Sequence, residues 1–389
     1  MKTLLSLFSC FFLFLQVNAN TYIVDNIQDS NDGLPYVEGD GTNTLRKLII
    51  LSNSNPGVDT ILFADTLSNN KIMVLSELPI ISDAELFING DFNDDKVPDI
   101  ILAGDSLSTA ESGITVYARY THIHGLVIQR FPGSGIVLDG ISANCSKITS
   151  CYLGTDILGM NDFGNNSRGI YVNEADSIII GEPGNGNLIS GNDADGIRVT
   201  NSTHTKICSN IIGLDITGNS TLGNESDGIQ LIDCEYVEIG DGTAAGRNII
   251  TGNYSFAINA DGGYGNSILG NYIGTDISGT IALGGGWHGI DFNDLTENYI
   301  IGNNLSDGGN LISGNWGHAI DLRGKKHTVS NNKIGLDASG LNPLGNDDAG
   351  IYSVCDSVII NENYICDNTA QGIVICGDVN LVANNYIGV

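Results

Sequence analysis

The side chains with the clearest chemical potential are two histidines and two aspartates that recur in adjacent repeats. His288 precedes Asp291 by the same interval as His318 precedes Asp321, and Arg323 follows the second aspartate. If the two copies stack, the carboxylates raise each other's proton affinity. Asp291 and Asp321 could then act as acid and base in glycoside cleavage. Alternatively, they could hold Ca²⁺ while Arg323 or a histidine removes the C5 proton of a sugar.

Residues suited to sugar contact lie close to these side chains in the sequence. Trp287 and Trp316 are the only two tryptophans, and each lies next to one of the histidines or within two residues of it. Asp261, Asn293 and Tyr352 fall on the same expected outward face, which predicts a substrate-binding surface. Imperfect repeats also copy Asp and His without a chemical role. Passive sugar contact and a solvated polar face are therefore alternative interpretations.

A second group of oxygen-bearing side chains occupies residues 91–99. Asp91, Asn93, Asp95 and Asp99 stand at positions 1, 3, 5 and 9 of this segment. That spacing can wrap Ca²⁺, so we expect calcium here as the one candidate cofactor. Position 6 is Lys96 where calcium loops carry glycine, and no glutamate stands at position 12. A polar turn is the alternative interpretation.

The elements that must position these residues are short strands in a repeated pattern. A tetrad of the type small-Ile-x-apolar recurs at intervals of 22 to 34 residues, and two further short alternating runs follow most copies. The tetrads begin at Gly113, Gly135, Gly169, Gly196, Gly228, Ala257, Gly289, Ala319, Gly350 and Gly372. Each repeat therefore holds three short strands separated by turns.

Two other periodic features mark the turns. An asparagine opens the third strand of each repeat, and stacked amides can hydrogen-bond to one another along a ladder. The expected ladder comprises Asn187, Asn210, Asn248, Asn271, Asn310, Asn332, Asn363 and Asn385. A longer loop, G-x-D-x-x-G-x-x-x-x-G, begins at Gly154, Gly213, Gly274 and Gly335, with spacings of 59, 61 and 61 residues. Its aspartates are typical of Asx turns.

The repeat pattern predicts an all-β fold, namely a right-handed parallel β-helix solenoid. Equivalent strands of successive coils must pair in parallel, with three strands per coil and about ten or more coils. We assign residues 111–389 to these repeats. Residues 20–110 form an N-terminal cap and irregular first coils, with helical spacing over 44–51 and Thr42, Asn43 or Thr44 as N-cap candidates. Residues 1–19 have the charged start, apolar run and small-residue site of a cleaved signal peptide.

Composition limits the partners. With 16 basic and 45 acidic residues the net charge is −29, which argues against nucleic acid because phosphate binding needs Lys and Arg. No apolar run after the signal is long enough for a membrane span. Seven cysteines remain after the signal, and we interpret them mostly as small buried residues, with a Cys145–Cys151 bridge as an alternative.

Two segments carry a resemblance to a known family. Residues 43–49 (NTLRKLI) and 53–61 (NSNPGVDTI) resemble the CSLREA-type N-terminal region of secreted bacterial β-helix proteins, although Asn43 and Lys47 replace the usual Cys and Glu. The loop at 271–276 (NYIGTD) is similar to loops of the same proteins. The resemblance implies a secreted or surface right-handed β-helix of the pectate-lyase-like superfold, often within a larger protein. It does not imply one activity.

These observations lead to two functional hypotheses. The first is a secreted or cell-surface structural or adhesive protein that contacts a polysaccharide or cell-surface glycan through one sheet face. The alternative is a polysaccharide lyase or glycoside hydrolase acting on extracellular glycans. Residues 386–389 fall inside an expected strand, so we also expect further domains C-terminal to residue 389.

Overall fold

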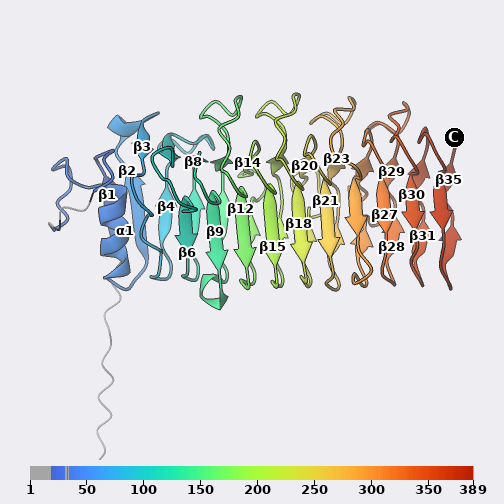
Figure 1. Cartoon of the computed structure of the whole chain (residues 1–389), viewed down its shortest axis with the longest axis horizontal. Coiled ribbons are helices and arrows are strands. Elements are labelled where there is room, and N and C mark those ends of the chain that lie inside the picture. The colour runs from blue at the N-terminus through green and yellow to red at the C-terminus, as the bar shows by residue number, and fades with distance from the viewer. Residues whose placement is uncertain (1–18, 31–32, 34, 306, 389) are drawn as a thin grey trace, which may run out of the picture.

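The chain winds into a parallel β-helix with three strands in each regular coil, as the sequence predicts. The computed structural model describes residues 19–30, 33, 35–305 and 307–388, so the expected signal peptide lies almost entirely outside the described residues. Equivalent strands stack side by side along one long axis (Figure 1). They form three all-parallel sheets of 13, 12 and 10 strands, here called sheets A, B and C. This topology is consistent with the right-handed crossover that parallel strands favour.

The strands are short, and their bounds follow sheet by sheet. Sheet A contains β1 (Asn20–Val24), β2 (Asp59–Phe63), β4 (Phe87–Asn89), β7 (His122–His124), β10 (Lys147–Thr149), β13 (Ile179–Ile180), β16 (Lys206–Ile207), β19 (Glu238–Ile239), β22 (Ser267–Ile268), β25 (Ile300–Ile301), β28 (Thr328–Ser330), β31 (Ile359–Asn361) and β34 (Leu381–Ala383). Sheet B contains β3 (Lys71–Met73), β5 (Ile100–Ala103), β8 (Leu126–Gln129), β11 (Tyr152–Leu153), β14 (Leu188–Ile189), β17 (Ile211–Ile212), β20 (Ile249–Ile250), β23 (Tyr272–Ile273), β26 (Leu311–Ile312), β29 (Lys333–Ile334), β32 (Tyr364–Ile365) and β35 (Tyr386–Ile387). Sheet C contains β6 (Ile114–Val116), β9 (Ile136–Asp139), β12 (Ile170–Asn173), β15 (Ile197–Thr200), β18 (Ile229–Ile232), β21 (Ile258–Asp261), β24 (Ile290–Phe292), β27 (Ile320–Leu322), β30 (Ile351–Ser353) and β33 (Ile373–Ile375).

The isoleucine of each tetrad points into the core. Ile258 pairs with Ile290 and Ile290 with Ile320, and all three side chains are fully buried. Side chains alternate between the two faces of a strand, so the residue after each isoleucine must point outward. This register is the reason that sheet C presents one outward side chain per coil in a straight row.

The predicted asparagine ladder runs along the turn between sheets A and B. Each Nδ2 donates to the Oδ1 of the asparagine one coil further on, as between Asn248 and Asn271 at 2.9 Å. The same Nδ2 of Asn248 also donates to the carbonyl of Ile207 at 2.7 Å, and its Oδ1 accepts from Asn210. These bonds satisfy amides that, except for that of Asn385, are fully or nearly fully buried at a sharp bend. All eight predicted asparagines belong to this ladder.

A second asparagine ladder, which the sequence analysis did not identify, runs along the turn into sheet C. Its members are Asn165, Asn192, Asn224 and Asn253, followed after a break by Asn315, Asn346 and Asn368. Gly285 stands at the break, where the other long-loop coils have asparagine. Its φ is +111°, and a Cβ atom there would lie 2.5 Å from the Cα of Gly252. Among the described residues, the buried Oδ1 of Asn315 consequently has no hydrogen-bond partner.

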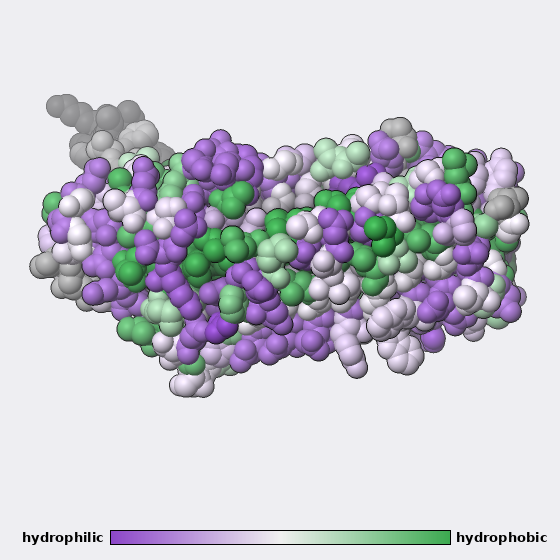
Figure 2. Space-filling model, turned by 90° about the horizontal axis from the view of Figure 1, so that it is seen from above, coloured by the Kyte–Doolittle hydropathy of each residue, from purple (hydrophilic) through white to green (hydrophobic). Residues whose placement is uncertain are grey.

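The four long loops project from the same side of the coils (Figure 1). Their aspartates hold the loop backbone, although by bonds to amides four and five residues on and not two residues on as in an Asx turn: Asp276 Oδ1 accepts from the amides of Thr280 and Ile281, both at 2.9 Å. Hydrogen bonds, led by that from Asn342, hold the pKa of Asp337 well below its usual range. Seen from above, polar residues cover much of this face and apolar residues form separate patches (Figure 2).

The N-terminal end of the core is covered by α1 (Leu45–Asn53), within the predicted cap (Figure 1). Thr44 is its N-cap, and its Oγ1 accepts a hydrogen bond from Lys47 N. Two short 3₁₀ turns, η1 (Asp65–Leu67) and η2 (Ile141–Ala143), complete the helical content of the described residues. None of the helices in the described part of the chain has the length and apolar character that a bilayer span requires.

Cys145 and Cys151 are free thiols, so the alternative of a bridge between them is wrong in this structure. Cys151 is fully buried, and its Sγ lies 3.3 Å from the carbonyl oxygen of Thr149. Cys145 sits in a turn with a positive φ of 62° and is only partly buried. Most of the others are buried, in agreement with the interpretation of small core residues.

The first ladder generates a stability prediction. Asn248→Ala removes one rung and leaves the buried backbone N–H of Asn210 without its acceptor. The carbonyl of Ile207 and the side-chain amide of Asn210 each lose one hydrogen bond and keep another, to Gly240 N and to the carbonyl of Ile180. We expect the free energy of unfolding to fall by about 2–4 kcal/mol, since an orphaned buried group costs roughly 1–3 kcal/mol and the other lost hydrogen bonds add to this cost. Denaturant unfolding checks this value. Asn166→Ala, at an exposed position, is the control and should lie within about 0.5 kcal/mol of the parent. Equal losses in both variants would contradict the role of the ladder.

Candidate functional site

The two aspartates meet on the outward face of sheet C. β24 and β27 are adjacent parallel strands, and Asp291 pairs directly with Asp321 in their register. Both follow an inward isoleucine, so both carboxyls leave the sheet on the same side. Asp321 is only 5% exposed, and Asp291 is partly buried. The structure therefore brings together the pair on which both catalytic interpretations depend.

The two histidines stack beside this pair in a column of rings. The ring centroids of His288 and His318 are 4.8 Å apart with an interplanar angle of 10°. Phe256 stacks on His288 at 5.7 Å, and Tyr352 stacks on His318 at 4.9 Å. The column therefore includes Tyr352, which the sequence analysis assigned to substrate binding, and Phe256, which it did not single out.

The hydrogen bonds of the histidines determine which nitrogen carries the proton. The backbone N–H of His318 donates to Nδ1 of His288 at 2.8 Å, and that of Ala349 donates to Nδ1 of His318 at 3.2 Å. A neutral ring with an accepting Nδ1 carries its proton on Nε2. Nε2 of His288 lies 3.9 Å from Oδ2 of Asp321, which is longer than a hydrogen bond. Burial and the neighbouring His318 lower the pKa of His288 to about 4, so the ring is neutral near pH 7.

The carboxylates have perturbed proton affinities. Burial and the charge of Asp321 raise the pKa of Asp291 from 3.8 to about 7. Burial also raises the pKa of Asp321, but the Arg323 guanidinium and His318 oppose that shift. Arg323 Nε lies 3.9 Å from Oδ1 of Asp321, an oxygen with no hydrogen-bond partner among the described residues. In this coupled pair the proton therefore resides mainly on Asp291 while Asp321 is ionised.

Further polar side chains extend the site towards the preceding coils. Asn293 donates to Oδ1 of Asp261 at 3.2 Å, and Gln230 donates to Oδ2 of the same carboxylate at 3.3 Å. Asp227, which the sequence analysis did not assign to the site, is 3% exposed and accepts from Asn259 at 2.9 Å. Burial raises the pKa of Asp227. Its signal in the sequence was its place immediately before a tetrad, the same place that His288 and His318 occupy.

Aromatic side chains border the site along the turn into sheet C. Trp287 and Trp316 are 68% and 66% exposed, so their rings are accessible to a ligand. Trp316 and Tyr254 help to line a cavity of about 200 Å³, whose wall includes Gly285 and Gly286. The break in the second asparagine ladder thus lies in the wall of a hollow beside the candidate site. Tyr254, 72% exposed, is a sugar-stacking candidate that the sequence analysis missed.

Two chemistries are open to this arrangement. The ligand atoms of His288, Asp291 and Asp321 lie within 4.8 Å of one another, close enough to converge on one cation. Alternatively, a protonated and an ionised carboxyl side by side form an acid–base pair. Burial and the like charge of Asp321 raise the proton affinity of Asp291. Shifts of this origin are typical of functional sites.

The oxygen atoms of the predicted calcium loop are mostly engaged with the loop itself. Asp91 accepts from the amides of Asp95 and Lys96, and Asp99 accepts from Phe92 N and Ser68 Oγ. Asn93 Oδ1 and Asp95 Oδ1 likewise accept from backbone amides two residues on. A different set, Asp91, Asp94 and His124, has ligand atoms within 4.8 Å of one another. Calcium at this loop stays a prediction, and the hydrogen bonds favour the polar-turn alternative.

The pKa of Asp291 generates a prediction that needs no substrate. Between about pH 4 and pH 7 the folded chain retains a proton that the unfolded chain releases, so stability is lost as the pH rises through this window. Asp291→Asn cannot ionise. We expect it to raise the thermal unfolding midpoint by roughly 2 °C or more at pH 8, and to have little effect at pH 4. Scanning calorimetry of Asp291→Asn and of Asp294→Asn, at an exposed turn position, measures the difference. A gain that is the same at both pH values would contradict the shifted pKa.

Comparison with known proteins supports the fold. No protein-family model matches the chain, and no curated protein matches it in sequence. Solved structures do match. A mutant of the periplasmic alginate epimerase AlgG superposes with a TM-score of 0.51 at 13% identity, covering 85% of this chain and 75% of that one. The Dettilon tailspike protein superposes with a TM-score of 0.50 at 16% identity, covering 93% and 68%. At such identities the shared property is the parallel β-helix fold.

Proposed function

We propose that this chain is a secreted or cell-surface carbohydrate-active protein that binds a glycan along sheet C and cleaves it by acid–base chemistry at Asp291 and Asp321. The observation that carries the proposal is the direct pairing of two outward carboxyls, one with its pKa raised to about 7. A carboxylic acid that keeps its proton near neutral pH can protonate a leaving-group oxygen.

The environment assigns a role to each carboxyl. Asp291 retains the proton and acts as the general acid. Asp321 lies near the Arg323 guanidinium and acts as the nucleophile or base. Adjacent strands of a sheet lie about 4.8 Å apart, closer to the ~5–5.5 Å separation of retaining glycosidases than to the ~6.5–9.5 Å of inverting ones. His288, neutral and with its proton on Nε2, can donate a hydrogen bond to a substrate oxygen.

The charges along sheet C favour particular glycans. The electrostatic environment of this stretch of the face is set mainly by four carboxyls, those of Asp227, Asp261, Asp291 and Asp321. Arg323 is the cation beside the Asp291–Asp321 pair. An acidic polymer would meet repulsion here unless a divalent cation bridged it to the carboxylates. An uncharged glycan with stacking contacts to Trp287 and Trp316 fits the face better.

The fold and the expected signal peptide support an extracellular glycan as the ligand. One matched protein is a periplasmic alginate epimerase and another is a tailspike protein, and both are consistent with a glycan ligand outside the cytoplasm. A structural or adhesive role with passive glycan contact is the second candidate. It is favoured by the two asparagine ladders, which make a stiff stalk whose buried turn amides are hydrogen-bonded within the chain.

Turnover on a polysaccharide panel distinguishes the two candidates. We expect the parent protein to release reducing or unsaturated ends from at least one uncharged or calcium-bridged glycan. Asp321→Ala should lower the rate by at least about 100-fold, because it removes one member of the acid–base pair. Asp294→Asn, an exposed aspartate in the turn after β24, is the matched control and should retain the parent rate. Binding without turnover across the panel would instead support the adhesive role.

The pH profile tests the assignment of the acid. Activity should fall as the pH rises through about 7, because Asp291 then loses the proton that it must donate. It should also fall at low pH, once Asp321 is protonated. In Asp291→Asn the alkaline limb should disappear together with most of the rate. An alkaline limb that persists at the same pH in this variant would show that another group is the acid.

A further inference from the structure

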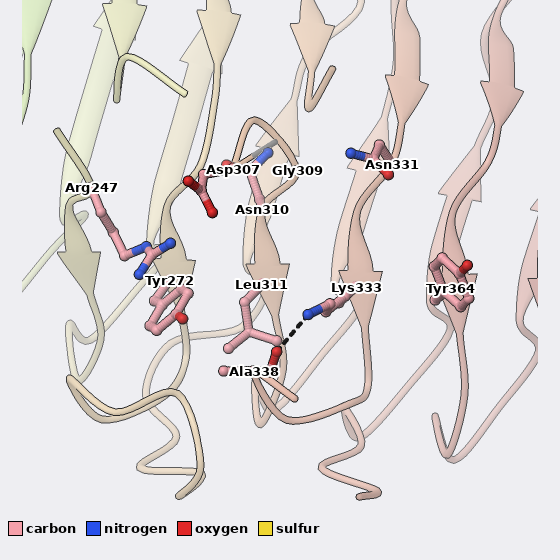
Figure 3. A pocket seen from close by; sticks show the side chains of 10 residues that line it. All are labelled: Arg247, Tyr272, Asp307, Gly309, Asn310, Leu311, Asn331, Lys333, Ala338 and Tyr364. Atoms are coloured by element: carbon pink, nitrogen blue, oxygen red, sulfur yellow. Dashed lines mark hydrogen bonds between the residues drawn. The ribbon is translucent and has the colours of Figure 1, made fainter. Parts of the chain in front are cut away.

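A cavity of about 230 Å³ opens on sheet B, on a different sheet from the aspartate pair (Figure 3). It lies over β23, β26, β29 and β32, whose outward residues Tyr272, Leu311, Lys333 and Tyr364 follow one another in register. Arg247, Asp307 and Asn331 approach from the turn that leads into this sheet. No part of the function proposed above uses these residues.

Two cations are held in place at this cavity. The guanidinium carbon of Arg247 lies 3.9 Å above the centre of the Tyr272 ring, and its Nε donates to the carbonyl of Gly270 at 3.0 Å. The Lys333 ammonium donates to the carbonyl of Ala338, which belongs to the last long loop (Figure 3). A guanidinium carries five donors and an ammonium three. Each group therefore keeps donors for a ligand after these bonds.

Arg247 and Lys333 form no salt bridge with the described residues, whereas other neighbouring cations such as Arg168 and Arg198 share a carboxylate. Only 16 basic residues accompany 45 acidic ones, and many are paired with a carboxylate, such as Lys147 with Glu182 and Lys206 with Glu238. Asp307 is the one carboxylate among the residues that line the cavity, so the lining has a net charge of +1. Glu362 lines the adjoining hollow beside Tyr364 and Tyr386.

We infer that this cavity binds the carboxylate of a uronic acid unit within a linear acidic glycan. Arg247 and Lys333 hold the carboxylate, while Asp307 and Asn331 are placed to bond sugar hydroxyls. Arg247 covers one face of the Tyr272 ring and Tyr386 covers one face of the Tyr364 ring, so each tyrosine contributes its other face or its edge to contact with a sugar ring. The row continues along the axis to Tyr386, which stacks on Tyr364 at 4.7 Å. A linear polymer can follow such a row, whereas an isolated small anion would use only its cationic end.

The inference is independent of catalysis on sheet C. The two faces have opposite character: carboxylates dominate around Asp291, and cations converge around Lys333. An acidic glycan would therefore be held by sheet B while sheet C remains free for another chain or another segment.

Binding of a galacturonate hexamer, followed by isothermal titration calorimetry at low ionic strength and pH 7, tests the site. We expect the parent protein to bind the hexamer and not its carboxyl-reduced, uncharged counterpart. Arg247→Gln and Lys333→Met, which keep most of the side-chain volume, should each weaken binding at least about tenfold. Raising the salt concentration should weaken binding in the parent as well. Lys206→Met, on sheet A, is the matched control and should bind like the parent.

Other outcomes would overturn the inference. These are no heat with the parent, equal binding of the uncharged counterpart, or unchanged affinity in both cavity variants whose thermal unfolding matches the parent. Inorganic phosphate that binds as tightly as the hexamer would identify a simple anion site instead. Asp321→Asn should leave hexamer binding within about twofold of the parent, so failure of this site and failure of the proposed catalysis are distinguishable.

Discussion

The structure depends on one constraint, namely that equivalent residues of successive coils stack in register at the spacing of parallel strands. Backbone hydrogen bonds between the strands hold the coils together, but they leave buried polar groups at the turns without partners. The two asparagine ladders supply these partners, because a carboxamide both donates and accepts hydrogen bonds along the stacking direction. A side chain lacking either function cannot occupy a rung without orphaning its neighbours.

The same constraint governs the chemistry of the outward faces. Side chains at the same position of neighbouring coils lie in contact, because adjacent strands are only about 4.8 Å apart. Two aspartates at one position of β24 and β27 must share a small, partly buried volume, and the raised pKa of Asp291 is the electrostatic consequence. The stacked rings of His288, His318 and Tyr352 arise in the same way. Backbone amides donate to Nδ1 of the two histidines and so set their tautomer. Where Gly285 interrupts a ladder, the turn opens beside the site.

Much of the candidate site could be predicted because the register of a solenoid can be read from its repeats. Placing the tetrad isoleucine inward was enough to pair Asp291 with Asp321 and His288 with His318. The residues of the sheet B cavity could not be predicted in this way. Arg247 lies outside the strands, and Lys333 belongs to a short strand of sheet B. Their positions at one cavity depend on how a turn and a long loop pack, as the contacts of Arg247 with Tyr272 and of Lys333 with Ala338 show.

The sequence by itself determined the fold class, the inward and outward residues of sheet C and the rungs of the first ladder, since each follows from a periodic pattern and the two-residue alternation of strands. Only the tertiary structure decided the protonation of the carboxyl pair, the engagement of the Asp91 loop with its own amides and the cavity on sheet B. The protonation depends on how deeply the two strand carboxyls are buried, and the other two features depend on distances between side chains of different turns. The length and path of most turns vary from repeat to repeat, so the periodic pattern does not give these distances.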